Sequence, residues 1–147
     1  MARQPRSHLP DGVYHATARC DDDRAIYLDD LDRRAFLRRL AIVARRWTWT
    51  IHAWCLMTTH YHLVVEAARA ALSEGLRELN GPYARRFNER HGRRGHLFEE
   101  RFAAHVIEAD EHLEAACLYV LANPVRAGLC RTPDDWPWGG LGDPRSV

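Results

Sequence analysis

The sequence predicts an α+β fold in one domain, an antiparallel sheet covered by helices in a split βαβ order. Runs of strand-forming residues alternate with stretches whose apolar residues recur at helical spacing. Two of the strand-forming runs follow one another across a short turn. The chain of 147 residues is long enough for one compact core and too short for two ordinary domains. We therefore expect residues 1–147 to form a single domain.

The first half of the chain predicts a strand, a helix and two further strands. Residues 1–12 are expected to form a loose N-terminal arm, and residues 13–19 are rich in strand formers. Residues 30–47 carry apolar side chains at helical spacing among arginines, which predicts an amphipathic helix. The second and third strands are expected at 48–57 and 61–66, with two threonines marking the turn between them.

The next part of the chain predicts an interrupted helix and a fourth strand. Residues 70–80 are helical in pattern, and a helical continuation follows at 83–90. Gly81 and Pro82 are expected to break or kink the helix between these two parts. Residues 101–107 predict the fourth strand.

The last part of the chain predicts a third helix and an irregular tail. Asp110 is a good N-cap, and Pro124 is expected to end this helix at Asn123. Residues 131–147 are expected to form irregular structure packed by tryptophans. The first six elements match a ferredoxin-like split βαβ arrangement, to which the third helix is added at the C-terminal end.

The composition argues against several classes of protein. The formal net charge is +1, so the whole molecule is not a generic binder of polyanions. The apolar stretches are far shorter than a membrane span and no signal peptide follows Met1, which predicts a cytoplasmic protein without a membrane partner. The spacing of the four cysteines favours neither a zinc site nor a disulfide framework, and Cys55 and Cys117 are expected in the core.

His60 and His62 flank a tyrosine where the third strand is expected to begin. Alternate side chains of a strand point to the same face, so the two imidazoles project side by side and can share a divalent cation. The alternative is a pair of exposed strand histidines that bind nothing. The triplet alone leaves both interpretations open.

Tyr119 and Asn123 lie four positions apart in the third predicted helix and therefore on one face of it. If this helix docks on the sheet, it can hold a tyrosine hydroxyl and an amide oxygen over the two histidines. In the alternative interpretation, Tyr119 is a packing residue with a polar tip and Asn123 is the last helical residue before a proline.

Several segments, in the same order along the chain, resemble the IS200-type single-tyrosine transposases. They are Thr59-His60-Tyr61-His62-Leu63, residues 95–102 (Gly-His-Leu-Phe-Glu-Glu-Arg-Phe) and residues 119–128 (Tyr-Val-Leu-Ala-Asn-Pro-Val-Arg-Ala-Gly). Residues 14–19 (Tyr-His-Ala-Thr-Ala-Arg) and 135–138 (Asp-Trp-Pro-Trp) resemble, more narrowly, the branch associated with repetitive extragenic palindromes (REP). The resemblance spans most of the chain.

The resemblance implies a metal-dependent nuclease of the HUH type, named for two histidines that flank a hydrophobic residue. His60 and His62 match the two metal ligands, although the residue between them is Tyr61 rather than an aliphatic one. Tyr119 matches the nucleophile, and Asn123 takes the position that helps to complete the metal site. The implied cofactor is Mg²⁺ or Mn²⁺. The implied activity is cleavage and rejoining of single-stranded DNA at a hairpin through a 5′-phosphotyrosine.

Arginines are dense in the segment that follows the predicted break. Such a run is usually a solvated face, but beside a nuclease site it would follow the DNA backbone. Tyr83 could stack on an unpaired base or compete as nucleophile, although the position of Tyr119 relative to Asn123 favours Tyr119. The expected DNA-binding residues are Tyr83, Arg85, Arg86, Arg90, Arg93, Arg94 and Arg101.

A second hypothesis is a non-catalytic module of the same fold that binds single-stranded or hairpin nucleic acid. The two histidines and Tyr119 argue against it, because a pure binder has no need of all three. The sequence is compatible with a monomer and with a homodimer.

Overall fold

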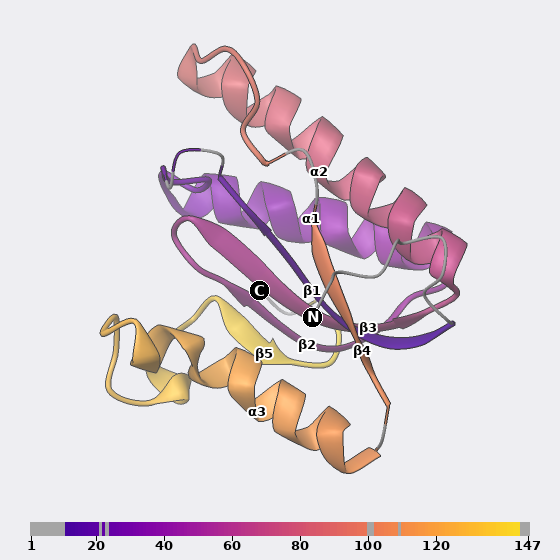
Figure 1. The fold of residues 1–147 in the computed structure, drawn as a ribbon. Coiled ribbons are helices and arrows are strands. Elements are labelled where there is room, and N and C mark those ends of the chain that lie inside the picture. The colour runs from indigo at the N-terminus through magenta and orange to yellow at the C-terminus, as the bar shows by residue number, and fades with distance from the viewer. Residues whose placement is uncertain (1–10, 21, 23, 100–101, 109, 145–147) are drawn as a thin grey trace.

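A five-stranded antiparallel sheet forms the centre of the protein, with helices on both of its faces (Figure 1). The computed structural model describes residues 11–20, 22, 24–99, 102–108 and 110–144. In chain order the elements are β1 (Gly12–Arg19), α1 (Asp30–Arg46), β2 (Thr50–Leu56), β3 (His60–Ala67), α2 (Arg69–His91), β4 (Ala103–Ile107), α3 (Asp110–Arg126), a 3₁₀ turn (Pro133–Asp135) and β5 (Gly139–Leu141). The predicted α+β class and antiparallel sheet are confirmed.

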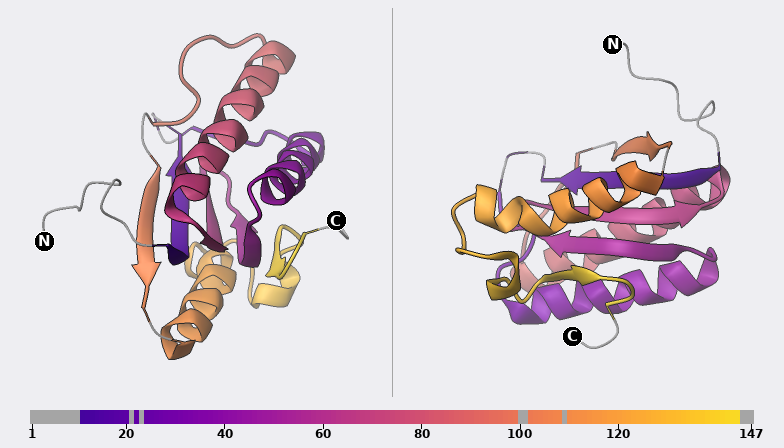
Figure 2. Two further views of the ribbon diagram at one scale, coloured as in Figure 1. Left: turned by 90° about the vertical axis from the view of Figure 1, so that its right-hand side faces the viewer. Right: turned by 90° about the horizontal axis from the view of Figure 1, so that it is seen from below.

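The strands lie in the order β4-β1-β3-β2-β5 across the sheet. The first four of these have the order of a ferredoxin-like split βαβ fold. Helices α1 and α2 cover one face, and α3 lies against the other (Figure 2). None of the helices within the described residues is long and apolar enough to cross a membrane.

Alternation along the strands divides the core into two clusters. Tyr14 of β1 and Tyr61 of β3 belong to the larger cluster, which is packed beneath α1 and α2. Val64 and Cys55 point to the other face, where Cys117 of α3 closes a smaller apolar cluster. Cys55 and Cys117 are buried, as predicted. Because the second cluster is small, polar side chains of the same sheet face lie directly beside α3.

Helix α2 runs unbroken through Pro82, so the predicted interruption is wrong. A proline lacks the N–H that would bond to the carbonyl four residues earlier, here that of Glu78. The side chain of Arg39 in α1 replaces this donor, with its Nε 3.2 Å from the Glu78 carbonyl oxygen. A hydrogen bond from the neighbouring helix thus satisfies the carbonyl that the proline leaves open.

Helix α3 passes Pro124 and ends at Arg126, so the predicted end at Asn123 is wrong. The carbonyl that Pro124 leaves without a backbone donor belongs to Val120. The side-chain Nδ2 of Asn123 lies 3.4 Å from this oxygen and donates to it. Asp110 is the first residue of the helix rather than the residue before it.

The other differences from prediction lie at the ends of strands. Gly12, assigned to the loose arm, is the first residue of β1, and residues 1–10 of that arm lie outside the described residues. Thr48 has a φ of 55°, which takes it out of β2. The tail contains β5, which pairs with β2, while the indole Nε1 of Trp136 donates to the carbonyl of Leu56 (3.1 Å).

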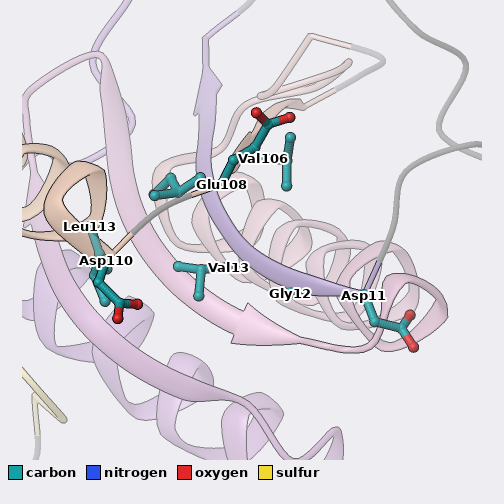
Figure 3. Close-up of a pocket in the computed structure, with 8 residues that line it drawn as sticks. Asp11, Gly12, Val13, Val106, Glu108, Asp110 and Leu113 are labelled. Carbon is teal, nitrogen blue, oxygen red and sulfur yellow. The ribbon is translucent and has the colours of Figure 1, made fainter.

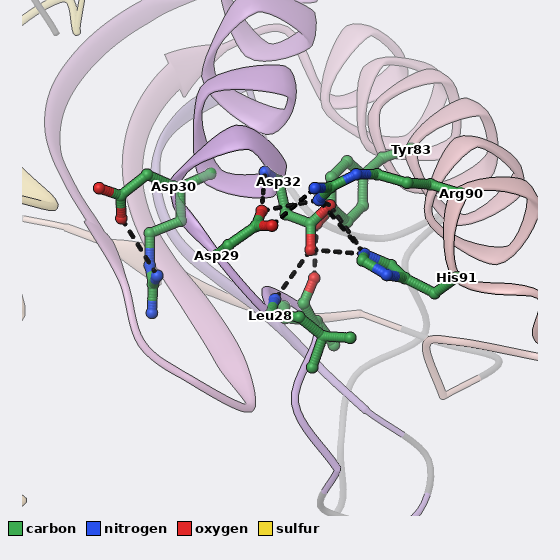
Figure 4. Close-up of polar contacts among 9 residues, drawn as sticks. Leu28, Asp29, Asp30, Asp32, Tyr83, Arg90 and His91 are labelled. Carbon is green, nitrogen blue, oxygen red and sulfur yellow. Dashed lines mark hydrogen bonds and ion pairs between the residues drawn. The ribbon is translucent and has the colours of Figure 1, made fainter.

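A cluster of charged side chains joins the end of α2 to the start of α1 (Figure 4). The buried Asp32 carboxylate accepts hydrogen bonds from the Leu28 N–H (2.8 Å), Arg90 Nη1 (2.7 Å) and His91 Nε2 (2.8 Å). Asp29 accepts from the Asp32 N–H at the start of α1 (3.0 Å) and pairs with Arg90 Nη2 (2.6 Å). We call these residues the Asp32 cluster.

Candidate active site

The two strand histidines point to the α3 face of the sheet, while the tyrosine between them points to the α1–α2 face. The His60 and His62 rings have centroids 4.9 Å apart, and Nδ1 of His60 lies 3.0 Å from Oγ1 of Thr59. Tyr61 is fully buried, and its hydroxyl donates to Oδ1 of Asn80 (2.6 Å). The alternation of β3 therefore brings the two imidazoles together, as the sequence predicts.

His62 is buried and has an unusual nitrogen. Its exposed fraction is 8%, and its Nε2 is buried without a hydrogen-bond partner among the described residues. Burial, reinforced by the nearby His60 and His15, lowers the pKa of His62 to about 3. The ring is therefore neutral at physiological pH, the form in which histidine binds a metal ion.

His15 of β1 is a neighbour of His62 that the sequence did not single out. Its Nε2 lies 2.9 Å from Nδ1 of His62, and the two rings have centroids 5.1 Å apart. The β1–β3 pairing places Thr17 opposite His62, which brings His15 next to it on the same face. The alternation of β1 could have placed His15 on a face with the motif, but the cross-strand register is not readable from the sequence.

Tyr119 lies on the side of α3 that faces these histidines. Its ring packs edge-on against His15, with centroids 6.0 Å apart and an interplanar angle of 67°. Half of the residue (51%) is exposed to solvent. Helix α3 thus brings a solvent-accessible phenol next to His15. We call His15, His60 and His62, which lie together on this face of the sheet, the histidine group.

Arg126 is a second neighbour that sequence reasoning missed. Its guanidinium carbon lies 3.9 Å from the centroid of the Tyr119 ring, in a cation–π contact. Its Nη2 donates to the Tyr119 carbonyl (2.7 Å) and to Oδ1 of Asn123 (2.8 Å). The positive charge of Arg126 also helps to lower the pKa of His62. A position seven residues after Tyr119, two helical turns along one face, was the available signal.

The side chains on this face include donor atoms that could bind a divalent cation. Two imidazoles with an amide oxygen are donors that Mn²⁺ accepts, and the buried, unpartnered Nε2 of His62 offers a lone pair in one of the two neutral tautomers of the ring. The amide oxygen of Asn123 has a second lone pair besides the one that faces Arg126. Among the described residues, no three His, Cys, Asp or Glu side chains are grouped for a metal, so such a site needs the amide.

The arginine-rich segment is less uniform than predicted. Tyr83 is 2% exposed and its hydroxyl donates to the Ile26 carbonyl, so its assignment to base stacking is wrong, because a buried ring cannot reach a base. The same burial argues against Tyr83 as nucleophile. Arg90 is held by the Asp32 cluster, and Arg93 packs over the ring of Phe87 (5.4 Å).

In the arginine-rich segment, Arg85, Arg86 and Arg94 are exposed, as is the ion-paired Arg90, and Arg101 lies outside the described residues. The segment lies on the α1–α2 side of the sheet but at the same strand ends as the histidines. Phe98 bridges to Cys20, just after β1, while Arg19 is the register partner of His60.

A surface pocket of about 380 Å³ lies at the other end of β1 (Figure 3). Its lining includes the carboxylates of Asp11, Glu108 and Asp110. These three negative charges would repel a DNA phosphate. The pocket is therefore separate from the histidine group and unsuited to a nucleic acid.

Residues 9–123 match the protein-family model described as "Transposase IS200 like". The chain belongs to the IS200-like transposase family, whose members are enzymes that act on DNA. No curated protein matches the sequence.

Two solved structures share the fold. One, described as a REP-associated tyrosine transposase bound to a REP hairpin, superposes with a TM-score of 0.75 at 23% identity, covering 95% of this chain and 82% of the other. The second is a proposed transposase from Deinococcus radiodurans, with a TM-score of 0.53 at 17% identity, covering 83% of this chain and 97% of the other.

Proposed function

We propose that this protein is a metal-dependent tyrosine transposase of the HUH type, which cuts and rejoins single-stranded DNA beside a REP-like hairpin. One observation carries the assignment of the nucleophile. Of the five tyrosines, four are at most 2% exposed, and Tyr119 is 51% exposed. Tyr119 is also the tyrosine that lies beside the histidine group and Arg126.

His60, His62 and Asn123 are the residues that would hold a divalent cation. The neutral state of His62 and its unpartnered Nε2 support this assignment. A bound Mg²⁺ or Mn²⁺ would polarise the scissile phosphate. Asn123 Nδ2 donates to the Val120 carbonyl, so the amide oxygen, the atom a cation needs, is the end that faces Arg126.

Tyr119 would supply the nucleophile for the covalent step. Its Oη bonds to the phosphorus, the bond from phosphorus to the 3′-oxygen of the preceding nucleotide breaks, and a 5′-phosphotyrosine forms. The phenol proton passes to water, and the departing 3′-oxygen takes up a proton to become a free 3′-OH. Because the phosphotyrosine link is itself a phosphodiester that keeps the energy of the broken bond, attack by a 3′-OH on its phosphorus, with release of the Tyr119 hydroxyl, rejoins strands without ATP. The guanidinium of Arg126 over the ring stabilises the negative charge that develops on the phenol oxygen.

The proposed partner is hairpin DNA with a single-stranded flank. The relative of known structure that covers 95% of this chain is described as bound to a REP hairpin. Arg85, Arg86 and Arg94 are exposed on the α1–α2 side of the sheet, where they could contact phosphates of a DNA that extends past the sheet edge. A monomer and a homodimer both fit the proposal, because every residue invoked lies in one chain.

The test is a covalent-adduct assay. The protein is incubated with 5′- or 3′-labelled hairpin oligonucleotides carrying single-stranded flanks, with Mn²⁺ or Mg²⁺, and run on a denaturing gel. We expect a protein–DNA adduct and a shortened strand with a free 3′-OH. Tyr119→Phe should abolish the adduct, whereas Tyr83→Phe, which removes a buried hydroxyl, should leave it in place.

An adduct that survives Tyr119→Phe would overturn the nucleophile assignment. Tight hairpin binding that needs no divalent metal, without cleavage of any hairpin, would favour the non-catalytic binding module instead. Loss of the adduct in Tyr83→Phe but not in Tyr119→Phe would transfer the role to the buried tyrosine.

A further inference from the structure

The site contains a hydrogen bond between two histidines that the proposed chemistry does not itself require. Nε2 of His15 lies 2.9 Å from Nδ1 of His62. Each of the two motif histidines thus has a protein neighbour at its Nδ1 atom, Thr59 Oγ1 for His60 and His15 for His62. Groups that engage the non-ligating nitrogen of a histidine fix its tautomer and ring orientation in metal sites.

The direction of this hydrogen bond decides what His62 can bind. If His15 donates, the neutral His62 ring carries its proton on Nε2, which is buried and has no partner within the described residues. An unpaired buried donor is destabilising, and an N–H cannot face a cation. If His62 donates from Nδ1, its Nε2 keeps a lone pair, and a cation would satisfy it.

His15 also contacts the nucleophile. Its ring lies edge-on to Tyr119 (6.0 Å) as well as against His62 (5.1 Å). The side chain therefore stands between the helix that carries the phenol and the strand that carries the histidines. A residue in this place fixes the position of both groups relative to each other.

We propose that His15 is a positioning residue: its Nε2 accepts a hydrogen bond from Nδ1–H of His62, which directs Nε2 of His62 to a divalent cation, and its ring supports Tyr119. The inference rests on the proposed function, because the cation is part of that proposal. His15 itself touches neither the cation nor the DNA.

The first test uses the metal-free protein. Long-range ¹H–¹⁵N spectra at neutral pH report the tautomer of each histidine. We expect His62 in the Nδ1–H form in the wild type and a shift towards the Nε2–H form in His15→Leu. His15→Gln, whose Oε1 can accept the same bond, should keep the Nδ1–H form. Wild-type His62 in the Nε2–H form would overturn the inference.

The second test measures Mn²⁺ affinity by calorimetry. His15→Leu should weaken Mn²⁺ binding about 10- to 100-fold, and His15→Gln should recover most of the loss. His105→Leu is the matched control, because His105 is the register partner of His15 on the neighbouring strand β4 and is exposed. Its affinity should stay within about twofold of the wild type.

The outcomes separate the inference from the proposed function. Unchanged Mn²⁺ affinity in His15→Leu, with an unchanged melting temperature, overturns the role of His15. A wild-type protein with the expected tautomer and Mn²⁺ affinity but no covalent adduct overturns the proposed function alone. A wild-type protein that binds no Mn²⁺ overturns both.

Discussion

Two histidines on opposite faces of the sheet, His62 and His91, have opposite surroundings. His91 donates to the buried carboxylate of Asp32, which also pairs with Arg90. His62 lies against another histidine, and the charges of Arg19 and Arg126 help to lower its pKa. In the Asp32 cluster, the carboxylates accept hydrogen bonds from Leu28 N–H, Arg90 and His91. In the histidine group, one buried nitrogen has no hydrogen-bond partner in the part of the chain that the structure describes.

Both residues are histidines, so the residue type alone does not tell a structural role from a functional one. Their hydrogen-bond partners do. A buried polar atom without a partner costs free energy, and such atoms are rare in folded proteins. The Asp32 cluster stabilises the contact between α1 and α2. The open nitrogen of His62 is a cost that a ligand would remove, which is why we place binding there rather than at His91.

The largest difference in adduct formation and Mn²⁺ binding is expected between two single variants, His62→Ala and His91→Ala. His62→Ala should abolish the covalent adduct and weaken Mn²⁺ binding by about 100-fold or more, because a proposed ligand is lost. His91→Ala should leave both within about threefold, because it touches only the Asp32 cluster. Adduct assays and Mn²⁺ titrations measure these effects. Equal losses in the two variants would contradict the division of roles.

Arg126, which contacts both Tyr119 and Asn123, should affect the rate of adduct formation. Arg126→Ala should slow adduct formation by about 10- to 100-fold, because the charge over Tyr119 and the donor to Asn123 Oδ1 are both lost. Arg126→Lys should recover little of the rate, since an ammonium cannot stack on the ring and bond the amide in the same way. Single-turnover kinetics give the rates. A fully active Arg126→Lys variant would show that only charge is needed.

The Asp32 cluster should respond in stability rather than in activity. Asp32→Ala leaves the Leu28 N–H, Arg90 and His91 without a common acceptor, and we expect a loss of about 2–3 kcal/mol in the free energy of unfolding. Urea denaturation measures this loss. The folded variant should form the adduct at the wild-type rate. A stability within 0.5 kcal/mol, on the order of ordinary surface substitutions, would contradict the prediction.

The smallest effect is a pH dependence of stability that involves Asp29. Hydrogen bonds from Arg90, and then from the Asp32 N–H, hold the pKa of Asp29 well below its usual range. The unfolded chain therefore binds more protons than the folded protein below about pH 4, and this contribution to stability is lost as the pH falls. Asp29→Asn should flatten the fall of the melting temperature between about pH 5 and 3. The change should be small, because the Asp29 side chain is 44% exposed and its interactions are screened by solvent.

The parts of the candidate site that sequence reasoning could predict are those that local periodicity determines. The strand period places His60 and His62 on one face, and the helix period places Tyr119 and Asn123 on another; both periods hold in the structure. His15 depended on the pairing of β1 with β3, which a single sequence does not specify. Tyr83 is buried by packing between α1, α2 and the sheet. The arginines around it in the sequence suggested instead that this part of the helix is exposed.

The errors in the fold have local causes. Prolines were expected to stop helices, because each leaves one backbone carbonyl without its donor. At Pro82 a side chain of the neighbouring helix α1 bonds to that carbonyl, and at Pro124 a side chain of the same helix does so. Strand β5 has three residues, two of them glycines, and carries too little pattern to be recognised. Its place in the sheet follows from pairing with β2.

Pro124 has a consequence for the chemistry of its neighbour. An asparagine amide has two ends of similar shape, one that attracts cations and one that repels them. Because Pro124 has no amide hydrogen, the Val120 carbonyl engages the NH₂ end of Asn123, and the oxygen end points to Arg126. A proline that carries no reactive group therefore determines which end of its neighbour's side chain remains available for the proposed role as a cation ligand.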